Sequence, residues 1–165
     1  MRWIMDTNGA SAGVPLQQGI LIAPEALRKH SLFGGLSAGQ IESMLPYMEY
    51  KTFQAREVIM SEGVYNDSIY FILEGRVEVK KNNVALAELR EGDAFGEMEL
   101  IEIIPVVATI RALDKVAALS LSNRKLHEIY KNDIATFAMV IMNFARDLSR
   151  RLRHMDIVAV GGNEE

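Results

Sequence analysis

The chain has 165 residues, of which 49% are hydrophobic and 24% are charged, a balance typical of a soluble globular domain with accessory helices. The formal net charge of -4 lacks the basic excess that supports general affinity for nucleic acid, so direct binding to DNA or RNA is not expected. The sequence contains no cysteine, which excludes disulfides, thiolate metal sites and a cysteine nucleophile. We expect a cytoplasmic protein that does not enter a membrane, because the first residues do not form a signal peptide and the longest nearly apolar stretch, 134–142, is too short to cross a bilayer.

The N-terminal part of the chain predicts an arm followed by two short helices. Residues 1–22 show no sustained periodicity and are expected to form an arm or linker, and residues 24–30 predict a short helix that begins at a proline. Ser37 and Gln40 have the spacing of a capping box, which predicts a second helix from Ser37. The same serine lies in a Gly-x-Ser-x-Gly sequence, 35–39, but the glycines before it disfavour the strand that a serine hydrolase needs there. We therefore expect Ser37 to be a helix cap.

Residues 48–122 have the two-residue period of β-strands. Residues 76–80 alternate strictly between polar and apolar, and residues 69–73 form a short buried run. Turn sequences interrupt the pattern at Gly63, Gly75 and Gly92. Seven or eight short strands without intervening helices predict an antiparallel sandwich, barrel or jelly roll.

Helical periodicity returns in residues 123–155, with a short helix over 125–130 and a long one from Ile134. The long helix carries an apolar stripe at spacings of three and four, while a second stripe, Ala138, Met142 and Ala145, widens only its first half. The narrower distal half is typical of a helix pair, so a homodimer is expected, joined through Phe137, Ile141, Phe144, Leu148 and Leu152. Nearby arginines 146, 150, 151 and 153 are expected to be solvated flanks of this seam, and residues 156–165 to be a tail that ends in the polar segment 161–165.

The sequence gives no positive indication of catalysis. The three histidines, His30, His127 and His154, lie in predicted helices outside the β region, where they do not converge on a metal with strand carboxylates. No carboxylate pair or catalytic triad is apparent. We therefore expect no catalytic residue, no metal and no enzyme.

A glycine followed by an acid, Gly96-Glu97, is the one segment that suggests a ligand. A glycine at the start of a helical turn exposes backbone N–H groups that can hold a phosphate, and the acid can accept from ribose hydroxyls. The alternative is a tight structural turn in which Phe95, Met98 and Leu100 fill the core.

The order of these elements resembles the cyclic nucleotide-binding domain family. Gly63, the apolar quartet 69–72 and Gly75 match the family's spacing, and Gly92, Gly96-Glu97 and the strand after Pro105 follow in the family's order. The resemblance covers about residues 25–155. It implies a domain with N-terminal helices (23–47), an eight-stranded jelly roll, or β-roll (48–122), and C-terminal helices (123–155). It also implies that a phosphate-binding cassette lies between two strands and that the last helix acts as a lid or dimer contact.

The resemblance also implies a set of ligand-binding positions: Gly96, Glu97, Met98, Glu99, Leu100, Val106, Val107 and Ala108. In the family, the glycine and the following peptide groups approach the phosphate, and the acid holds the ribose 2′-hydroxyl. The family also expects a small residue at 99, an arginine at 106 that pairs with the phosphate, and a small or hydroxyl residue at 107. This chain has Glu99, Val106 and Val107 there, and Arg111 has the wrong strand parity to replace the arginine.

Two functions remain open at this point. The first is a regulatory or sensor domain in which a cyclic nucleotide or another small ligand binds weakly or in altered form, with the effector on a separate protein. The second is an interaction or scaffold protein whose pocket is vestigial and which acts through dimerisation of its C-terminal helix.

Overall fold

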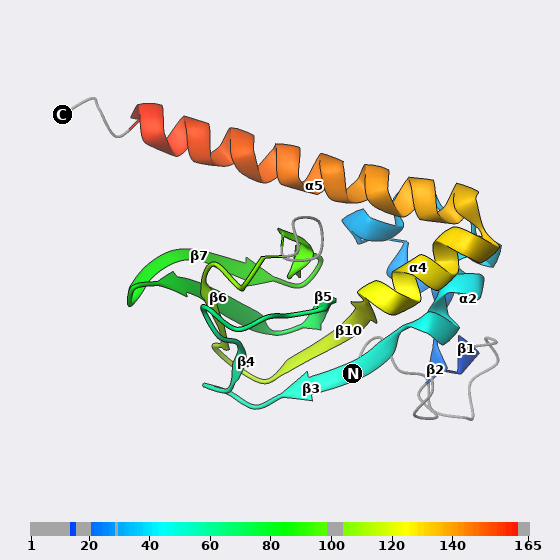
Figure 1. Cartoon of the computed structure of the whole chain (residues 1–165), viewed down its shortest axis with the longest axis horizontal. Coiled ribbons are helices and arrows are strands. Elements are labelled where there is room, and N and C mark those ends of the chain that lie inside the picture. Colours follow the sequence, from blue (N-terminus) through cyan, green and yellow to red (C-terminus); the bar gives the residue numbers. More distant parts are fainter. Residues whose placement is uncertain (1–13, 16–20, 29, 99–103, 162–165) are drawn as a thin grey trace.

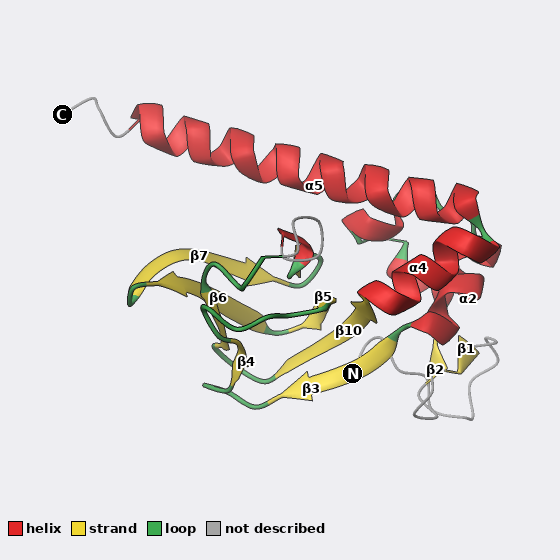
Figure 2. Cartoon of the chain, viewed as in Figure 1, coloured by secondary structure: helices red, strands yellow, loops and turns green. Residues whose placement is uncertain are grey.

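Eight strands form the two antiparallel sheets of a jelly roll in a computed structural model that describes residues 14–15, 21–28, 30–98 and 104–161 (Figures 1 and 2). The first sheet has the order β3 (Glu49–Phe53), β10 (Val116–Ser122), β5 (Ser68–Glu74) and β8 (Ala94–Phe95). The second has the order β4 (Val58–Met60), β9 (Thr109–Ala112), β6 (Arg76–Lys81) and β7 (Val84–Arg90). The predicted fold class is confirmed.

The register of the first sheet gives it two different buried faces. In β10, Val116 packs between the two sheets while Leu119 and Leu121 face the helices, because successive side chains of a strand point to opposite faces. The core between the sheets contains Met60, Ile72, Val77, Phe95, Val106, Ile110, Ala112 and Val116. The opposite face of the sheet is covered by the helices, so this sheet is buried on both sides.

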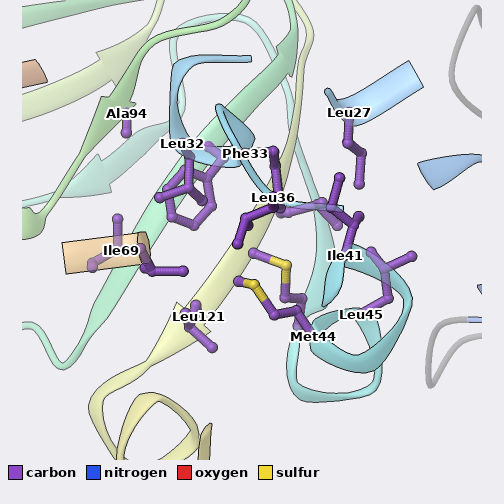
Figure 3. Packing of buried hydrophobic residues seen from close by; sticks show 14 of the residues in the cluster. Leu27, Leu32, Phe33, Leu36, Ile41, Met44, Leu45, Ile69, Ala94 and Leu121 are labelled. Carbon is purple, nitrogen blue, oxygen red and sulfur yellow. The ribbon is translucent and has the colours of Figure 1, made fainter. Parts of the chain in front are cut away.

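The N-terminal helices pack on the outer face of the first sheet, where Phe33, Leu36 and Met44 lie close to Ile69 and Leu121 (Figure 3). They are α1 (Pro24–Leu27), the 3-10 turn η1 (Ser31–Phe33), α2 (Ala38–Met44) and the 3-10 turn η2 (Leu45–Tyr47). Both hydrogen bonds of the capping box between Ser37 and Gln40 are present, so the serine is a helix cap as predicted. The first helix ends at Leu27, earlier than predicted, because His30 is extended and begins the next turn.

Part of the expected N-terminal arm is ordered against the domain. β1 (Val14–Pro15) and β2 (Leu21–Ile22) form a two-stranded antiparallel pair, and Ile22 is fully buried. The predicted boundary at residue 22 therefore falls within structure that belongs to the helical core.

The two C-terminal helices are α4 (Asn123–Asn132) and α5 (Ile134–Gly161), and α5 runs along the whole molecule from the N-terminal helices to the β-roll (Figure 1). The helix continues past its predicted end at residue 155, because no glycine or proline interrupts it before Gly161. Asp133 accepts hydrogen bonds from the Thr136 backbone N–H at 3.0 Å and from the Thr136 hydroxyl at 2.5 Å. These two bonds satisfy the start of α5 and lower the pKa of Asp133.

We expect Asp133→Ala to reduce the free energy of unfolding by about 1 kcal/mol at neutral pH, since it removes the acceptor at the start of α5. The lowered pKa means that this contribution is present above the unfolded-state pKa of the carboxyl group and is lost as pH falls through its folded-state value. Urea unfolding at neutral and acid pH measures both effects. Asp133→Asn is the matched control: it keeps an acceptor, so it should retain most of the stability while losing the pH dependence, and equal losses in both variants would contradict the capping role.

Candidate ligand-binding site

The cassette is the segment that follows β8, and the structure describes its residues 96–98. It begins with a glycine that no other residue can replace without strain. Gly96 has φ +86°, and a Cβ atom there would lie 2.6 Å from the Ser68 carbonyl oxygen and 3.1 Å from the Asn66 amide nitrogen. The amide of Asn66 itself donates to the Ser68 carbonyl at 2.5 Å. The turn is therefore fixed against the start of β5, and the backbone becomes helical at Glu97 and Met98.

Glu97 is a buried carboxylate, with 5% of the residue exposed. Its Oε1 atom accepts a hydrogen bond at 3.1 Å from Nη1 of Arg151, which comes from α5. The other terminal nitrogen of Arg151 donates to the Ala94 carbonyl and lies 2.8 Å from Asp147 Oδ2. One guanidinium group therefore joins the long helix to the end of β8 and to the acid of the cassette.

Asp147 extends this contact to the N-terminal helices. The residue is 6% exposed, accepts from the Ser31 hydroxyl at 3.3 Å, and also pairs with Arg150. One turn earlier on α5, the Asn143 amide donates to the Leu32 carbonyl at 2.5 Å and to the Gly34 carbonyl at 2.8 Å. A buried polar network thus connects α5, η1 and the cassette.

Val106 lies in the core between the two sheets, 3% exposed. Its carbonyl accepts from the Gly63 N–H at 2.8 Å and its N–H donates to the Val64 carbonyl at 2.9 Å, which fixes the segment before β9 against the loop after β4. Ala108 is also buried and Val107 is half-buried. The position that the family resemblance assigns to a phosphate-binding arginine is therefore an apolar core position.

Arg111 does not reach this site. It is exposed and alternates with Ile110 and Ala112, which are buried in the core between the sheets, so its side chain leaves the opposite face of β9. This agrees with the strand parity in the sequence.

The remaining predicted site residues are only partly described. Met98 is 45% exposed, so it does not fill the core as the structural-turn alternative required, although Phe95 does. Glu99 and Leu100 lie outside the described residues. Arg151 and Asp147 were not predicted as site residues. The prediction of a solvated flank is wrong for Arg151, whose side chain is only 27% exposed and paired with buried acids.

The predicted dimer stripe lies mostly inside the chain's own core. Phe144 is 4% exposed and stacks on Phe71 of β5 with ring centroids 6.0 Å apart, and Phe137 and Ile141 pack against the same cluster. Leu148 is half-buried, and Leu152 is 60% exposed. The first part of this stripe therefore holds α5 on its own domain.

A hollow of about 110 Å³ opens at the end of the first sheet, next to the start of α4. Its lining is polar and includes Lys51 and Lys125, which already face Glu49 at 2.6 Å and Glu128 at 2.9 Å. None of its lining residues belongs to the cassette. The hollow is a solvated end of the roll whose cations have carboxylate partners.

The described side chains include no group of three or more His, Asp or Glu residues that could hold a metal ion. His127 is exposed, and burial lowers the pKa of His30. In the described ranges, no helix is long and apolar enough to cross a membrane.

The cassette, the jelly roll and the terminal helices together define a cyclic nucleotide-binding class of domain. A family model described as the cyclic nucleotide-binding domain matches residues 50–133. The chain belongs to this family.

The chain is similar to regulatory proteins and to solved domains of the same fold. It is 28% identical over 102 residues to a cAMP-dependent protein kinase regulatory subunit of Debaryomyces hansenii, a match covering 61% of this chain and 23% of that protein. A cyclic nucleotide-binding domain from Methylobacillus flagellatus aligns with a TM-score of 0.76 at 24% identity, covering 87% of this chain and 83% of that one. For the Thermus thermophilus catabolite activator protein the TM-score is 0.67 at 25% identity, covering 78% and 61%. The chain spans about a quarter of the length of the curated relatives that it matches.

We expect Gly96→Ala to lower the free energy of unfolding by about 1–3 kcal/mol, because a side chain there is strained in φ and meets the Ser68 carbonyl. Gly39→Ala is the matched control. A Cβ at Gly39, in α2, meets nothing within 4 Å, so this variant should gain about 0.5–1 kcal/mol. Chemical denaturation of both variants measures the difference, and a neutral Gly96→Ala would show that the turn relaxes.

Proposed function

We propose that this protein is a regulatory domain that takes a small ligand through Gly96 and Glu97 and binds cAMP and cGMP only weakly. The burial of Val106 carries the proposal, because it places an apolar core residue where the family uses an arginine for the phosphate. The regulatory role is supported by the relatives, which include a kinase regulatory subunit and an activator protein. We propose no catalytic role, and place the effector on a separate protein.

The loss of the arginine is large enough to decide affinity. Removing one partner of a buried charge pair costs about 2–5 kcal/mol. Since a tenfold change in affinity is about 1.4 kcal/mol, the valine alone weakens phosphate binding roughly 30- to 3000-fold. Arg111 points away from the site, and Arg151 is already paired with Glu97 and Asp147.

A specific observation also favours the second candidate, an interaction protein with a vestigial pocket. The acid that would hold a ribose hydroxyl has a structural partner, Arg151, and the pair holds α5 on the roll. In this case Glu97 serves the fold, and the protein acts through surfaces of the roll and of α5.

We expect the dissociation constants for cAMP and cGMP to lie well above the micromolar range, as measured by calorimetry. Val106→Arg combined with Glu99→Ala should tighten binding by at least about tenfold, because it supplies a donor for the phosphate and removes a like charge. Val107→Arg with Glu99→Ala is the matched control, since it places the same charge one residue along the chain. Tight binding by the unsubstituted protein would contradict the proposal, and no gain in the first variant would show that the cassette cannot present its N–H groups.

We also propose a homodimer, formed through the outer face of α5. Ala138, Met142, Ala145, Ser149 and Leu152 are all exposed on this face and recur at alternating spacings of four and three. Met142 is 50% exposed and Leu152 is 60% exposed. This heptad spacing is typical of a helix pair. The proposed seam is therefore the second apolar stripe of α5, continued to Leu152, in place of the stripe predicted from the sequence.

We expect Met142→Glu and Leu152→Glu each to weaken dimerisation by roughly 100-fold or more, because an unpaired charge in a closed seam costs about 3 kcal/mol or more. Light scattering after size-exclusion chromatography measures the oligomeric state. Leu86→Glu is the matched control, since Leu86 lies on β7, outside the exposed stripe of α5, and is 58% exposed. A monomeric unsubstituted protein, or a dimer that survives both changes, would show that α5 is not the seam.

A further inference from the structure

We propose that Arg151 is a latch that holds the distal half of α5 on the cassette, and that it competes with a bound ligand for Glu97. Ligand binding at the cassette would then release this half of the helix, and anything that holds α5 down would oppose binding. The inference rests on the proposed function, because it concerns the regulation of the same site.

The first support is the way one guanidinium group is surrounded. Arg151 contacts acceptors from three places: the Glu97 carboxylate at 3.1 Å, the Ala94 carbonyl, and the Asp147 carboxylate at 2.8 Å. The planar fork of arginine suits several fixed acceptors at once, which a lysine would not satisfy equally well. The contact is therefore specific in its geometry, unlike a pairing of two exposed surface charges.

The second support is the burial of the carboxylate. With Arg151 in place, 6% of the Glu97 side chain is exposed. A ligand hydroxyl must come within about 3 Å of a carboxylate oxygen to donate to it. In the proposed latch, a ligand hydroxyl reaches Glu97 only after Arg151 has moved away, so the ligand and Arg151 compete for this carboxylate.

The third support is the uneven anchoring of α5. Its first half is held by apolar packing of Val140 and Phe144, both buried, and by the two hydrogen bonds of Asn143. Beyond Asp147, the described side chains of residues 149, 150, 152 and 153 are exposed, while Arg151 reaches back to the cassette. Figure 1 shows this distal part extending over the β-roll. Among the described side chains of residues 149–153, that of Arg151 contacts the cassette, so in the proposed latch loss of this contact frees that part of α5 and leaves the first half docked.

Linkage fixes the size and the sign of the effect. If the ligand binds only when Arg151 is released, its apparent affinity is reduced by the fraction of molecules in which the latch is open, and removal of Arg151 restores the affinity of the open state. Couplings of this kind are typically about 5- to 150-fold. We therefore expect a tenfold or larger gain in affinity when Arg151 cannot reach Glu97.

The chain offers a close control on the same turn of the helix. Arg150 also pairs with Asp147, but its side chain is 56% exposed and it makes no described contact with Glu97. Arg150→Gln and Arg151→Gln remove the same charge from adjacent positions. Only Arg151→Gln should open the latch.

The test combines a distance measurement with a titration. Because the sequence contains no cysteine, Arg153→Cys on α5 and Val84→Cys on β7, both exposed, give two unique positions for spin labels. Labelled protein is mixed with an excess of unlabelled protein so that each measured pair lies within one chain. The label distance is measured in the otherwise unsubstituted chain, in Arg150→Gln and in Arg151→Gln, and each protein without labels is titrated with cAMP and cGMP up to millimolar concentration.

We expect Arg151→Gln to lengthen or broaden the label distance and to lower the dissociation constant for cAMP or cGMP by about tenfold or more, with no change in Arg150→Gln. Saturating nucleotide should produce the same distance change in the unsubstituted chain. Glu97→Gln is the second variant: it removes the charge that pairs with Arg151 and also leaves a weaker, neutral acceptor for the ligand, so it should release α5 without any gain in affinity. Thermal unfolding of each variant verifies that the roll remains folded.

The contrary outcomes separate the inference from the proposed function. An unchanged label distance in both Arg151→Gln and Glu97→Gln would overturn the latch. A released helix with unchanged nucleotide affinity would overturn the competition and leave the proposed function standing. No binding of either nucleotide to any of the proteins at millimolar concentration would overturn the proposed function, and the competition with it.

Discussion

The sheet β3–β10–β5–β8 is buried on both faces, and the positions of the cassette and of α5 depend on this constraint. Alternate residues of its strands face either the core between the sheets or the helical core, so the register of β5 and β10 places both layers at once. Phe71 faces the helices and stacks on Phe144 of α5, while the neighbouring Tyr70 stacks on Phe95 immediately before the cassette. Phe144 of α5 and Phe95 before the candidate site are thus held by neighbouring residues on opposite faces of β5.

The core between the two sheets also limits which residue can stand where the family resemblance assigns a phosphate-binding arginine. Val106 packs in the core between the sheets, and its backbone bonds to the loop that contains Gly63 and Val64. A side chain in this position either completes the apolar core or projects a charge toward a phosphate, since a buried unpaired charge is strongly unfavourable. Valine favours the stability of the roll over binding of an anion. The cation nearest to the cassette acid among the described residues comes instead from α5, where Arg151 is shared with Asp147.

The sequence predicts the features that depend on local pattern. The two-residue period and the turn glycines predict the jelly roll, and the Ser37–Gln40 spacing predicts the helix cap. It does not predict the pairing of Glu97 with Arg151, which are 54 residues apart and follow no shared pattern. Nor does periodicity distinguish the two apolar stripes of α5, because both have helical spacing and only packing against Phe71 shows that the stripe with Phe144 faces inward. The sequence also does not distinguish Arg151 from the three neighbouring arginines, because nothing in its local pattern shows that it contacts a buried acid.

The two faces of α5 allow one helix to connect the candidate site to the proposed dimer seam. Its inner face carries Asp147 and Arg151, which bind the N-terminal turn and the cassette, and its outer face carries Met142 and Leu152, which are exposed. Because Arg151 and Leu152 are adjacent residues of one helix, a displacement of the part of α5 that carries Arg151 also moves Leu152 on the outer face. In the proposed scheme, events at Glu97 therefore reach the dimer seam through the backbone of one helix. This scheme needs no separate relay through the roll, and the proposed weakening of ligand binding by Val106 does not disturb the connection through α5.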